Sequence, residues 1–194
     1  MNDTASVNEG GSVLINLAGN DTDPDSALDL SSIVITSGPS HGSLVDHGDG
    51  TFTYTHDGSE TLADSFSYTI DDVSGATSNV ASVTVTFNAV NDVPSAPNGT
   101  ASVHEGASVV IDLAGNDTDP DGTVVPATVT VTGQPANGSV VNNGDGTVTY
   151  THNGSETTSD SFTYTIKDNS GATSNVATVN ITVTPVNDAP FVAS

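Results

Sequence analysis

The sequence is a tandem repeat, because a shift of 96 residues aligns it with itself without a gap. Between residues 3–98 and 99–194, 56 of the 96 positions are identical. The motif LAGNDTDPD recurs unchanged at 17–25 and 113–121. A repeat of this length has the size of a whole domain. We therefore expect two copies of one fold in an array that continues in both directions. Their predicted bounds are 1–93 and 94–194, with a joint rich in Pro, Gly, Ser and Asn at about 88–105.

Each copy has the pattern of an all-β domain. Val13, Ile15 and Leu17 alternate with polar residues, and Gly48-Asp49-Gly50 is typical of a hairpin turn. The strands expected in the first copy are 4–8, 12–17, 32–37, 42–46, 51–56, 65–71 and 76–87. No stretch has helical periodicity with caps. Seven strands in about 96 residues predict an immunoglobulin-like sandwich with its own hydrophobic core.

The net charge limits the possible partners. Twenty-four acidic residues face the single cation Lys167, which gives a formal charge of −23. Such a chain repels nucleic acids and anionic lipid surfaces but attracts cations. An alternative explanation is adaptation to salt, in which the acids keep the surface hydrated, and the two explanations are compatible.

Several further classes of protein are excluded by what the sequence lacks. It contains no cysteine, so it forms neither disulfides nor thiolate metal sites. It has no run of 18 apolar residues, so we expect no membrane insertion. Met1 is followed at once by Asn2 and Asp3, without the pattern of a signal peptide.

The acidic motif NDTDPD is the sharpest candidate for a metal site. In an extended loop, alternation would place the carboxylates of Asp21, Asp23 and Asp25 on one side. Carboxylates gathered in this way favour a hard cation with a preference for oxygen ligands, such as Ca²⁺. The motif is not an EF-hand, because Ser32 and Thr128 stand where that loop requires Glu. A solvated Asp-rich turn is an equally good interpretation of the spacing alone.

Four other aspartates have two possible roles. Asp72 and Asp168 stand in D-x-S-G turns, where each carboxylate can bind a metal or cap its own turn. Asp64 and Asp160 precede the aromatic strand of each copy, and a structural cap is the better interpretation for them.

No pattern in the sequence predicts catalysis. His56 and His152 recur at strand ends, but one histidine per copy without cysteine makes a zinc site improbable. The sequence has no nucleophile elbow and no Gly-rich phosphate loop. We therefore expect no enzyme.

Taken together, the motifs resemble those of a known family. The order is L-A-x-N-D-x-D, a G-D-G hairpin, D-S-F-x-Y-T-I, D-x-x-G and V-N-D-x-P, and it occurs twice. It is similar to the bacterial cadherin-like repeats of about 95 residues found in large RTX-type surface adhesins. The resemblance implies two Greek-key sandwiches, export by type I secretion, and a place on the bacterial cell surface in cell adhesion and biofilms.

The resemblance also implies Ca²⁺ bound where consecutive repeats meet. The residues implied at the central joint are Glu9, Glu60, Asn91, Asp92, Asp117, Asp119 and Asp168. Partial or second-tier sites are implied at Asp21, Asp23, Asp25, Asp72, Asp121, Glu105, Glu156, Asn187 and Asp188. Cadherin linkers read D-x-N-D-N, whereas Ala89 and Val93 stand at the first and last of these positions here, so fewer ligands are available.

Two functions remain open. The first is a structural spacer, monomeric by itself, whose partners are the neighbouring repeats of the same polypeptide. The second is an adhesive module that recognises a glycan or a protein on another cell. An enzyme is the third and weakest alternative.

Overall fold

The structure is a computed structural model that describes residues 1–190. It divides into two compact units, the first spanning Met1–Val90 and the second beginning at Asn91. The segment before the first strand of the second unit is held by that unit. Ser95 exchanges two backbone hydrogen bonds with Thr118, and the backbone of buried Ala96 bonds the side chain of Asn175.

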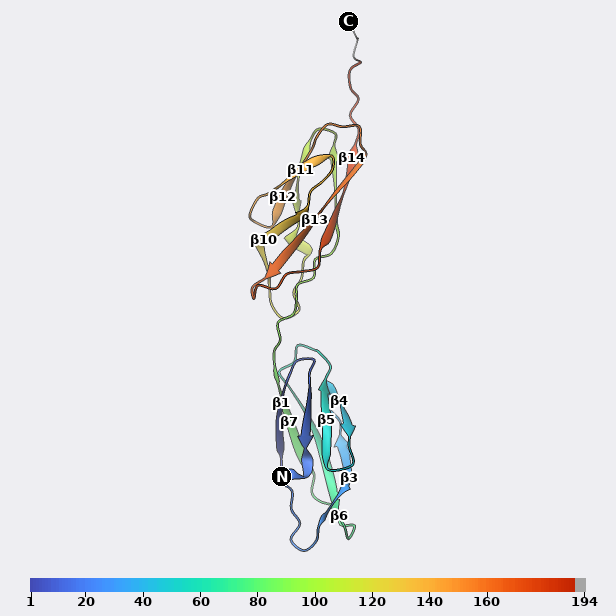
Figure 1. The fold of residues 1–194 in the computed structure, drawn as a ribbon, viewed down its shortest axis with the longest axis vertical. Helices are drawn as coiled ribbons and strands as arrows, with labels where there is room; N and C mark the ends of the chain where they lie inside the picture. Colours follow the sequence, from blue (N-terminus) through green and yellow to red (C-terminus); the bar gives the residue numbers. More distant parts are fainter. Residues whose placement is uncertain (191–194) are drawn as a thin grey trace. The chain divides into compact units, whose positions relative to one another are not determined.

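Both units are all-β, as predicted, with seven strands each among the described residues (Figure 1). Those of the first unit are β1 (Asp3–Asn8), β2 (Ser12–Asn16), β3 (Leu28–Ser37), β4 (Gly42–Asp46), β5 (Thr51–His56), β6 (Ala63–Asp72) and β7 (Ala81–Asn88). Those of the second unit are β8 (Gly99–His104), β9 (Ser108–Asp112), β10 (Val124–Gly133), β11 (Gly138–Asn142), β12 (Thr147–His152), β13 (Ser159–Asp168) and β14 (Ala177–Thr184).

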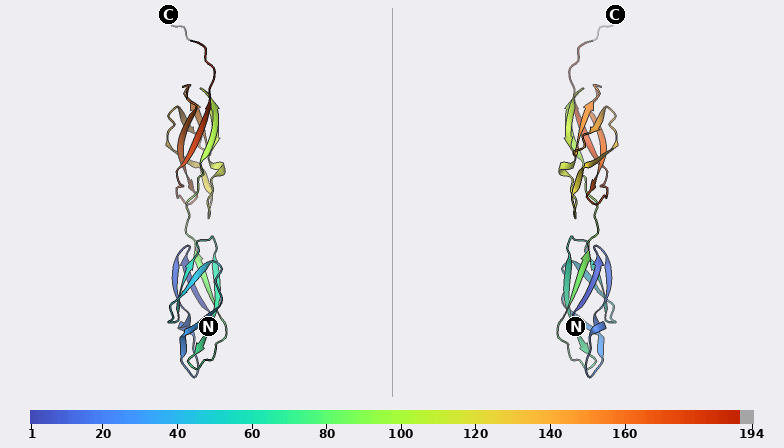
Figure 2. Two further views of the ribbon diagram at one scale, coloured as in Figure 1. Left: turned by 90° about the vertical axis from the view of Figure 1, so that its right-hand side faces the viewer. Right: turned by 90° about the vertical axis from the view of Figure 1, so that its left-hand side faces the viewer.

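Each unit is a sandwich of a four-stranded and a three-stranded sheet, which can be followed in Figure 2. The sheets of the first unit have the orders β1-β7-β6-β3 and β2-β5-β4. Those of the second have the equivalent orders β8-β14-β13-β10 and β9-β12-β11. The first strand of each unit pairs in parallel with the last, and every other pairing is antiparallel.

The core lies between the two sheets, on the faces that the alternating pattern predicts. In the first unit Phe52 and Tyr54 of β5 pack in one cluster with Phe66, Tyr68 and Ile70 of β6. The side chains between them in sequence are more exposed, because neighbouring residues of a strand point to opposite faces. The second unit has an equivalent cluster around Tyr150, Phe162 and Tyr164.

The predicted hairpin between 42–46 and 51–56 is confirmed, with Gly48 and Gly50 at positive φ. The last strand was predicted to begin at residue 76, and this is wrong, since β7 begins at Ala81. The reason is a turn on Asp72. Its backbone N–H donates to the carbonyl of Ala76, which turns the chain before the last strand can begin.

Two further boundaries differ from prediction. The third strand begins at Leu28 rather than at residue 32, and a bulge accommodates the extra residues. After β2 the chain forms a short 3-10 helix, Leu17–Asn20, which is matched by Ala114–Asn116 in the second unit. Each 3-10 helix leads directly into the acidic motif. Within residues 1–190 there is no helix of the length and apolar character needed to cross a membrane.

Candidate metal centres at the ends of the sandwich

Asp117 is the most deeply buried acid of the second copy of the acidic motif. Its side chain is 8% exposed, and its Oδ1 accepts a hydrogen bond of 3.0 Å from the hydroxyl of Tyr164. Its other oxygen, Oδ2, is buried without a hydrogen-bond partner. Burial raises the pKa of Asp117, and the charge of Asp112 adds to the rise while the bond from Tyr164 opposes it. Asp117 therefore offers one oxygen to a cation.

Asp119 is less satisfied still. Both of its carboxylate oxygens are shielded from solvent, and neither has a hydrogen-bond partner. Burial raises its pKa, and the negative charges of Asp121, Asp168 and Asp92 raise it further. A shielded carboxylate without donors is unfavourable unless a cation compensates it.

Asp168 caps its own turn with one carboxylate oxygen and faces the linker with the other. Its Oδ1 caps its own turn, accepting backbone N–H bonds of 2.9 Å from Ser170 and 2.8 Å from Ala172. Its Oδ2 faces the linker and accepts a bond of 2.8 Å from Asn91 Nδ2. The bond from Asn91 is the main cause that lowers the pKa of Asp168 against the effect of burial.

The linker also contacts the acidic motif directly. The backbone N–H of Asp92 donates to Asp121 Oδ1 at 3.3 Å. The second unit thus brings most of the predicted ligands at its linker end into one network of contacts and charges. They are Asn91, Asp92, Asp119, Asp121 and Asp168. Asp117 lies in the same motif, with its bond to the buried tyrosine.

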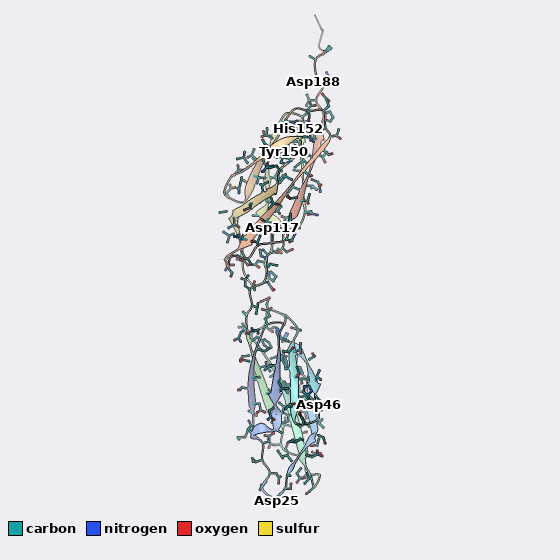
Figure 3. All side chains as sticks on the ribbon, viewed as in Figure 1. Asp25, Asp46, Asp117, Tyr150, His152 and Asp188 are labelled. Atoms are coloured by element: carbon teal, nitrogen blue, oxygen red, sulfur yellow. The ribbon has the colours of Figure 1, made fainter. Side chains whose placement is uncertain are left out.

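A second acidic cluster lies at the other end of the second unit, where the chain leaves β14. Carboxylate oxygens of Glu105, Glu156 and Asp188 lie within 4.8 Å of one another. The backbone N–H of Val186 donates to Glu105 Oε2 at 3.2 Å. The charge of Glu105 is the main cause that raises the pKa of Glu156, followed by burial and by Asp188. Figure 3 shows Asp188 and Asp117 toward opposite ends of this unit.

The same motif in the first unit is better satisfied. Asp23 Oδ1 accepts bonds of 3.0 Å from the backbone N–H of Asp25 and 2.7 Å from that of Ser26. The Ser26 hydroxyl lies 3.1 Å from Asp23 Oδ1 and 2.9 Å from Asp72 Oδ2. The backbone bonds lower the pKa of Asp23. The loop bends at residues 24–26 and is not extended throughout, contrary to the geometry assumed from the alternation of its acids.

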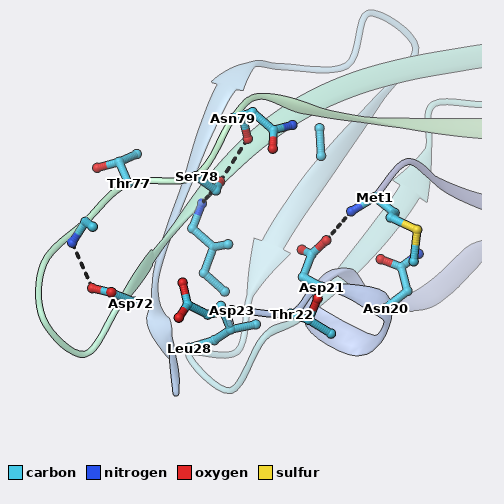
Figure 4. Close-up of a pocket in the computed structure, with 13 residues that line it drawn as sticks. Met1, Asn20, Asp21, Thr22, Asp23, Leu28, Asp72, Thr77, Ser78 and Asn79 are labelled. Atoms are coloured by element: carbon cyan, nitrogen blue, oxygen red, sulfur yellow. Dashed lines mark hydrogen bonds and ion pairs between the residues drawn. The ribbon is translucent and has the colours of Figure 1, made fainter. Parts of the chain in front are cut away.

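Asp21 and Asp72 line a pocket of about 330 Å³ beside this loop (Figure 4). Asp21 Oδ1 pairs with the amino group of Met1, and its Oδ2 accepts a bond of 2.8 Å from the Tyr68 hydroxyl. Asp72 Oδ1 caps its own turn, accepting bonds from the N–H groups of Ser74 and Ala76. Glu9, toward the other end of the unit, accepts a bond of 3.2 Å from the backbone N–H of Val90.

The structure assigns Asp64 and Asp160 the structural role that the sequence favoured. Asp64 accepts bonds of 3.0 Å from the N–H of Ser40, 2.8 Å from that of His41 and 3.0 Å from the Tyr54 hydroxyl. Asp160 has the same set of donors in the second unit. The hydrogen-bond donors of the protein therefore engage both oxygens of each carboxylate.

The motifs do not predict the tyrosines that orient the first aspartate of each motif, Tyr68 and Tyr164. They also give no role to Asp3, whose Oδ2 lies 3.0 Å from the Tyr68 hydroxyl. The spacing gave a partial signal, because both tyrosines share the buried face of their strand with core residues. A hydroxyl at the end of a buried ring requires a polar partner, and the acidic motif supplies it.

Clusters of carboxylates and amide oxygens provide the ligands that Ca²⁺ prefers, whereas Zn²⁺ is usually bound by Cys and His. The unpartnered oxygens of Asp117 and Asp119 fit a bound cation. The donors in the network are backbone N–H groups and one amide, which leave the net negative charge of the cluster in place.

Comparisons with known proteins agree with this architecture. The family model described as the bacterial cadherin-like domain matches residues 1–89 and again 91–185. The chain belongs to the bacterial cadherin-like domain family. Members of this family are non-enzymatic, extracellular adhesion modules, and cadherin-like domains generally bind calcium. No curated protein sequence matches the chain.

Solved structures show the fold. Drosophila N-cadherin EC1-4 aligns with a TM-score of 0.61 at 12% identity, and the match covers 94% of this chain and 48% of that one. Human protocadherin-24 EC1-2 aligns with a TM-score of 0.52 at 12% identity, covering 94% of this chain and 95% of that one. This cadherin-like chain therefore spans about half the length of the N-cadherin segment.

Proposed function

We propose that this bacterial cadherin-like chain is a spacer from a large RTX-type surface adhesin, and that bound Ca²⁺ makes it rigid where consecutive domains meet. The observation that carries the proposal is the Asp119 carboxylate, which is shielded from solvent without a hydrogen-bond donor and stands among the charges of Asp121, Asp168 and Asp92. A hard divalent cation is the partner that suits such a group.

The order of residues along the chain supports a site at each joint. The second unit carries a cluster of two glutamates and an aspartate, Glu105, Glu156 and Asp188, at the end where the chain leaves β14. In the repeat, these residues correspond to Glu9, Glu60 and Asp92. Asp92 lies in the linker that leads into the second acidic motif, so the chain itself connects the two groups of ligands. The proposed ligands at the central joint are Glu9, Glu60, Asn91, Asp92, Asp117, Asp119 and Asp168.

Repulsion between the carboxylates explains why the joint would respond to calcium. Two carboxylates about 4 Å apart repel by about 1 kcal/mol in water and by about 4 kcal/mol at an effective dielectric constant of 20. Without Ca²⁺ this repulsion keeps the joint open and mobile. Extracellular calcium modules bind with dissociation constants of about 10⁻⁴–10⁻³ M. Calcium at about 100 times that constant stabilises the binding-competent state by about 2.7 kcal/mol per site.

Small-angle scattering and calorimetry test the proposal on the whole chain. Added Ca²⁺ is expected to release or absorb measurable heat and to narrow the distribution of end-to-end distances relative to the chain in chelator. Asp92→Ala is expected to weaken the titration. Asp145→Asn is a control, because Asp145 caps a hairpin turn through Thr147 and belongs to neither cluster. An identical distance distribution with Ca²⁺ and with chelator would contradict the proposal.

One observation favours the second candidate, an adhesive module. Exposed Leu14 and Val45 flank Thr53 across the three-stranded sheet of the first unit. Val110 and Val141 flank Thr149 in the same way in the second unit. A glycan array probed in the presence of calcium separates the candidates, since a spacer alone binds none of the glycans.

A further inference from the structure

His152 is buried at the end of β12, four residues before Glu156 of the Glu105, Glu156 and Asp188 cluster, and its side chain has several polar contacts. The residue is 2% exposed. Its Nδ1 accepts backbone N–H bonds of 3.2 Å from Gly106 and 3.3 Å from Gly154. Its Nε2 lies 3.0 Å from the hydroxyl of Thr157. Figure 3 shows His152 toward the Asp188 end of the second unit.

These contacts select one tautomer of the ring. An N–H group is always a donor, so Nδ1 must present a lone pair to Gly106 and Gly154. The neutral ring then carries its proton on Nε2 and donates it to the Thr157 hydroxyl. Both nitrogens are engaged in this way, so neither has a lone pair available for a metal.

The two ends of the ring reach the two loops that carry the glutamates. Gly106 directly follows Glu105, and Thr157 directly follows Glu156. The ring therefore connects the residue after one glutamate with the residue after the other. Gly106 is at positive φ, which places a turn at this point, and the bond to Nδ1 restrains that turn.

The first unit has the same arrangement with different neighbours. His56 Nδ1 accepts bonds of 3.0 Å from Gly10 and 3.2 Å from Gly58, and its Nε2 lies 3.3 Å from Thr61 Oγ1. Gly10 follows Glu9, and Thr61 follows Glu60.

The neighbours that differ leave these bonds in place. The His56 ring packs against Phe87 at a centroid distance of 3.9 Å, whereas the equivalent residue in the second unit is Val183. Asp57, which lies near His56 Nε2, is replaced by Asn153. The connection between the glutamate loops is therefore independent of both the stacked ring and the nearby charge.

We propose that His152 and His56 are positioning residues for calcium, each holding the two glutamate loops of its unit at the separation that a shared ion requires. This inference rests on the proposed calcium function. A ligand pair held in place before binding loses less conformational freedom when the ion arrives. Residues that support metal ligands typically change metal affinity about 10- to 100-fold when they are substituted.

Three substitutions of His152 separate the contribution of the Nδ1 acceptor from that of the Nε2 donor. His152→Asn keeps an acceptor near the position of Nδ1, His152→Gln keeps a donor near the position of Nε2, and His152→Phe removes both. Amide NMR of the full chain, titrated with Ca²⁺, gives a dissociation constant at Gly106 and Glu156. We expect about 10-fold weaker binding for His152→Phe and smaller losses for the other two variants. The amides of Gly10 and Thr61 in the first unit serve as an internal reference.

The control must weaken the same core without touching the glutamate loops. Tyr150→Phe removes the hydroxyl that bonds Asp160 at 2.9 Å. It is expected to lower the melting temperature in chelator while the dissociation constant at Gly106 stays the same. Thr157→Val removes the partner of Nε2 alone, and it tests the inference even if a His152 variant does not fold.

A double-mutant cycle adds a readout that a purely structural role would not change. If His152 acts through the glutamates, His152→Phe should cost less calcium affinity in a Glu156→Gln background than in the wild type. Equal calcium affinity in the wild type, His152→Phe and Thr157→Val would overturn the positioning role and leave the calcium function intact. A wild-type Gly106 amide that does not respond to Ca²⁺ while the Gly10 amide responds would also overturn the positioning role of His152 and leave the calcium function intact. If neither amide responds, both proposals are overturned.

Discussion

The two copies of the motif NDTDPD have identical sequences but unequal surroundings. In the first unit Asp23 accepts two backbone N–H bonds and lies within hydrogen-bond distance of the Ser26 hydroxyl. In the second unit Asp119 accepts none, and Gly122 occupies the position of Ser26. The pKa of Asp23 is lowered by the backbone bonds, and that of Asp119 is raised by burial and nearby charge.

The difference teaches that the donors around a carboxylate, more than the motif itself, distinguish a structural acid from a candidate ligand. A carboxylate with several donors is already stabilised as an anion, so a cation adds little. A carboxylate without donors depends on a cation for the same stabilisation. Asp64 and Asp119 are the two extremes among the acids described above.

The largest effect on stability is expected from Asp64→Asn, because both oxygens of this carboxylate accept hydrogen bonds. The amide keeps one acceptor oxygen and replaces the other by a donor. Because Ser40 and His41 donate to different oxygens of Asp64, one of these two N–H groups is then left without an acceptor. The expected loss is about 1–3 kcal/mol of unfolding free energy. For a domain of this size, each 1 kcal/mol lowers the melting temperature by about 4–8 °C. Calorimetric melting of the whole chain measures it.

The matched expectation is that Asp64→Asn leaves the calcium titration unchanged, because this carboxylate is fully used by the protein. The equivalent variant in the second unit, Asp160→Asn, should behave in the same way. A clear loss of calcium affinity in either variant would show that the donor rule fails.

Asp119→Asn is expected to have the opposite pattern. Removing a charge that no donor compensates should raise stability in chelator and weaken calcium binding by about 10-fold or more, since ligand charge sets affinity in such sites. Asp23→Asn should instead lower stability in chelator, because Asp23 is a hydrogen-bonded anion. Titration calorimetry and melting in chelator measure both variants. If the two variants shift the melting temperature in the same direction, the contrast between the loops is not real.

The pH dependence of the calcium-free chain tests the same contrast. The pKa values of Asp117 and Asp119 are raised, so the folded state binds more protons than the unfolded state just above the ordinary value of 3.8. Stability is therefore expected to rise as the pH falls from neutral into the range of these raised pKa values.

Below that range the sign reverses. Donors outweigh the effect of burial at Asp64 and Asp160 and hold both pKa values below 3.8. The stability that these anions supply is present above their unfolded pKa and is lost as the pH falls through the folded values. Melting curves between pH 7 and pH 3 should show a maximum, and Asp119→Asn should reduce the rise on its neutral side. A steady decline from pH 7 would contradict the raised pKa values.

Sequence alone predicted the fold well, because alternation and the 96-residue repeat are strong signals. Phe66, Tyr68 and Ile70 were placed correctly on one buried face. The start of β7 was missed because the backbone bonds of the turn on Asp72 are not visible in an alternating pattern. The candidate ligands were named by motif and resemblance, but their hydrogen bonds were not predictable. They depend on which side chains the fold brings beside each acid, as the contacts of Asn91 and Ser26 show.

The smallest expected effect comes from exchanging Ser26 and Gly122, the first residue that differs after the shared motif. Gly122→Ser should supply a hydroxyl to Asp119, raise stability in chelator slightly and weaken calcium binding modestly. A Cβ at Gly122 would lie 2.5 Å from Asn169 Oδ1 and 2.6 Å from Asp119 Oδ2, so these side chains must move. The first unit has Val73 at the position of Asn169, which makes Gly122→Ser with Asn169→Val the matched variant.

The reverse exchange, Ser26→Gly, should make the first loop resemble the second. Its calcium-free stability should fall, because the Asp23 and Asp72 carboxylates lose the hydroxyl that lies between them. Melting in chelator and calcium titration of both variants complete the comparison. If neither exchange changes the balance between the loops, then the burial of Asp119 and the charges around it cause the difference, and the serine hydroxyl has no part in it.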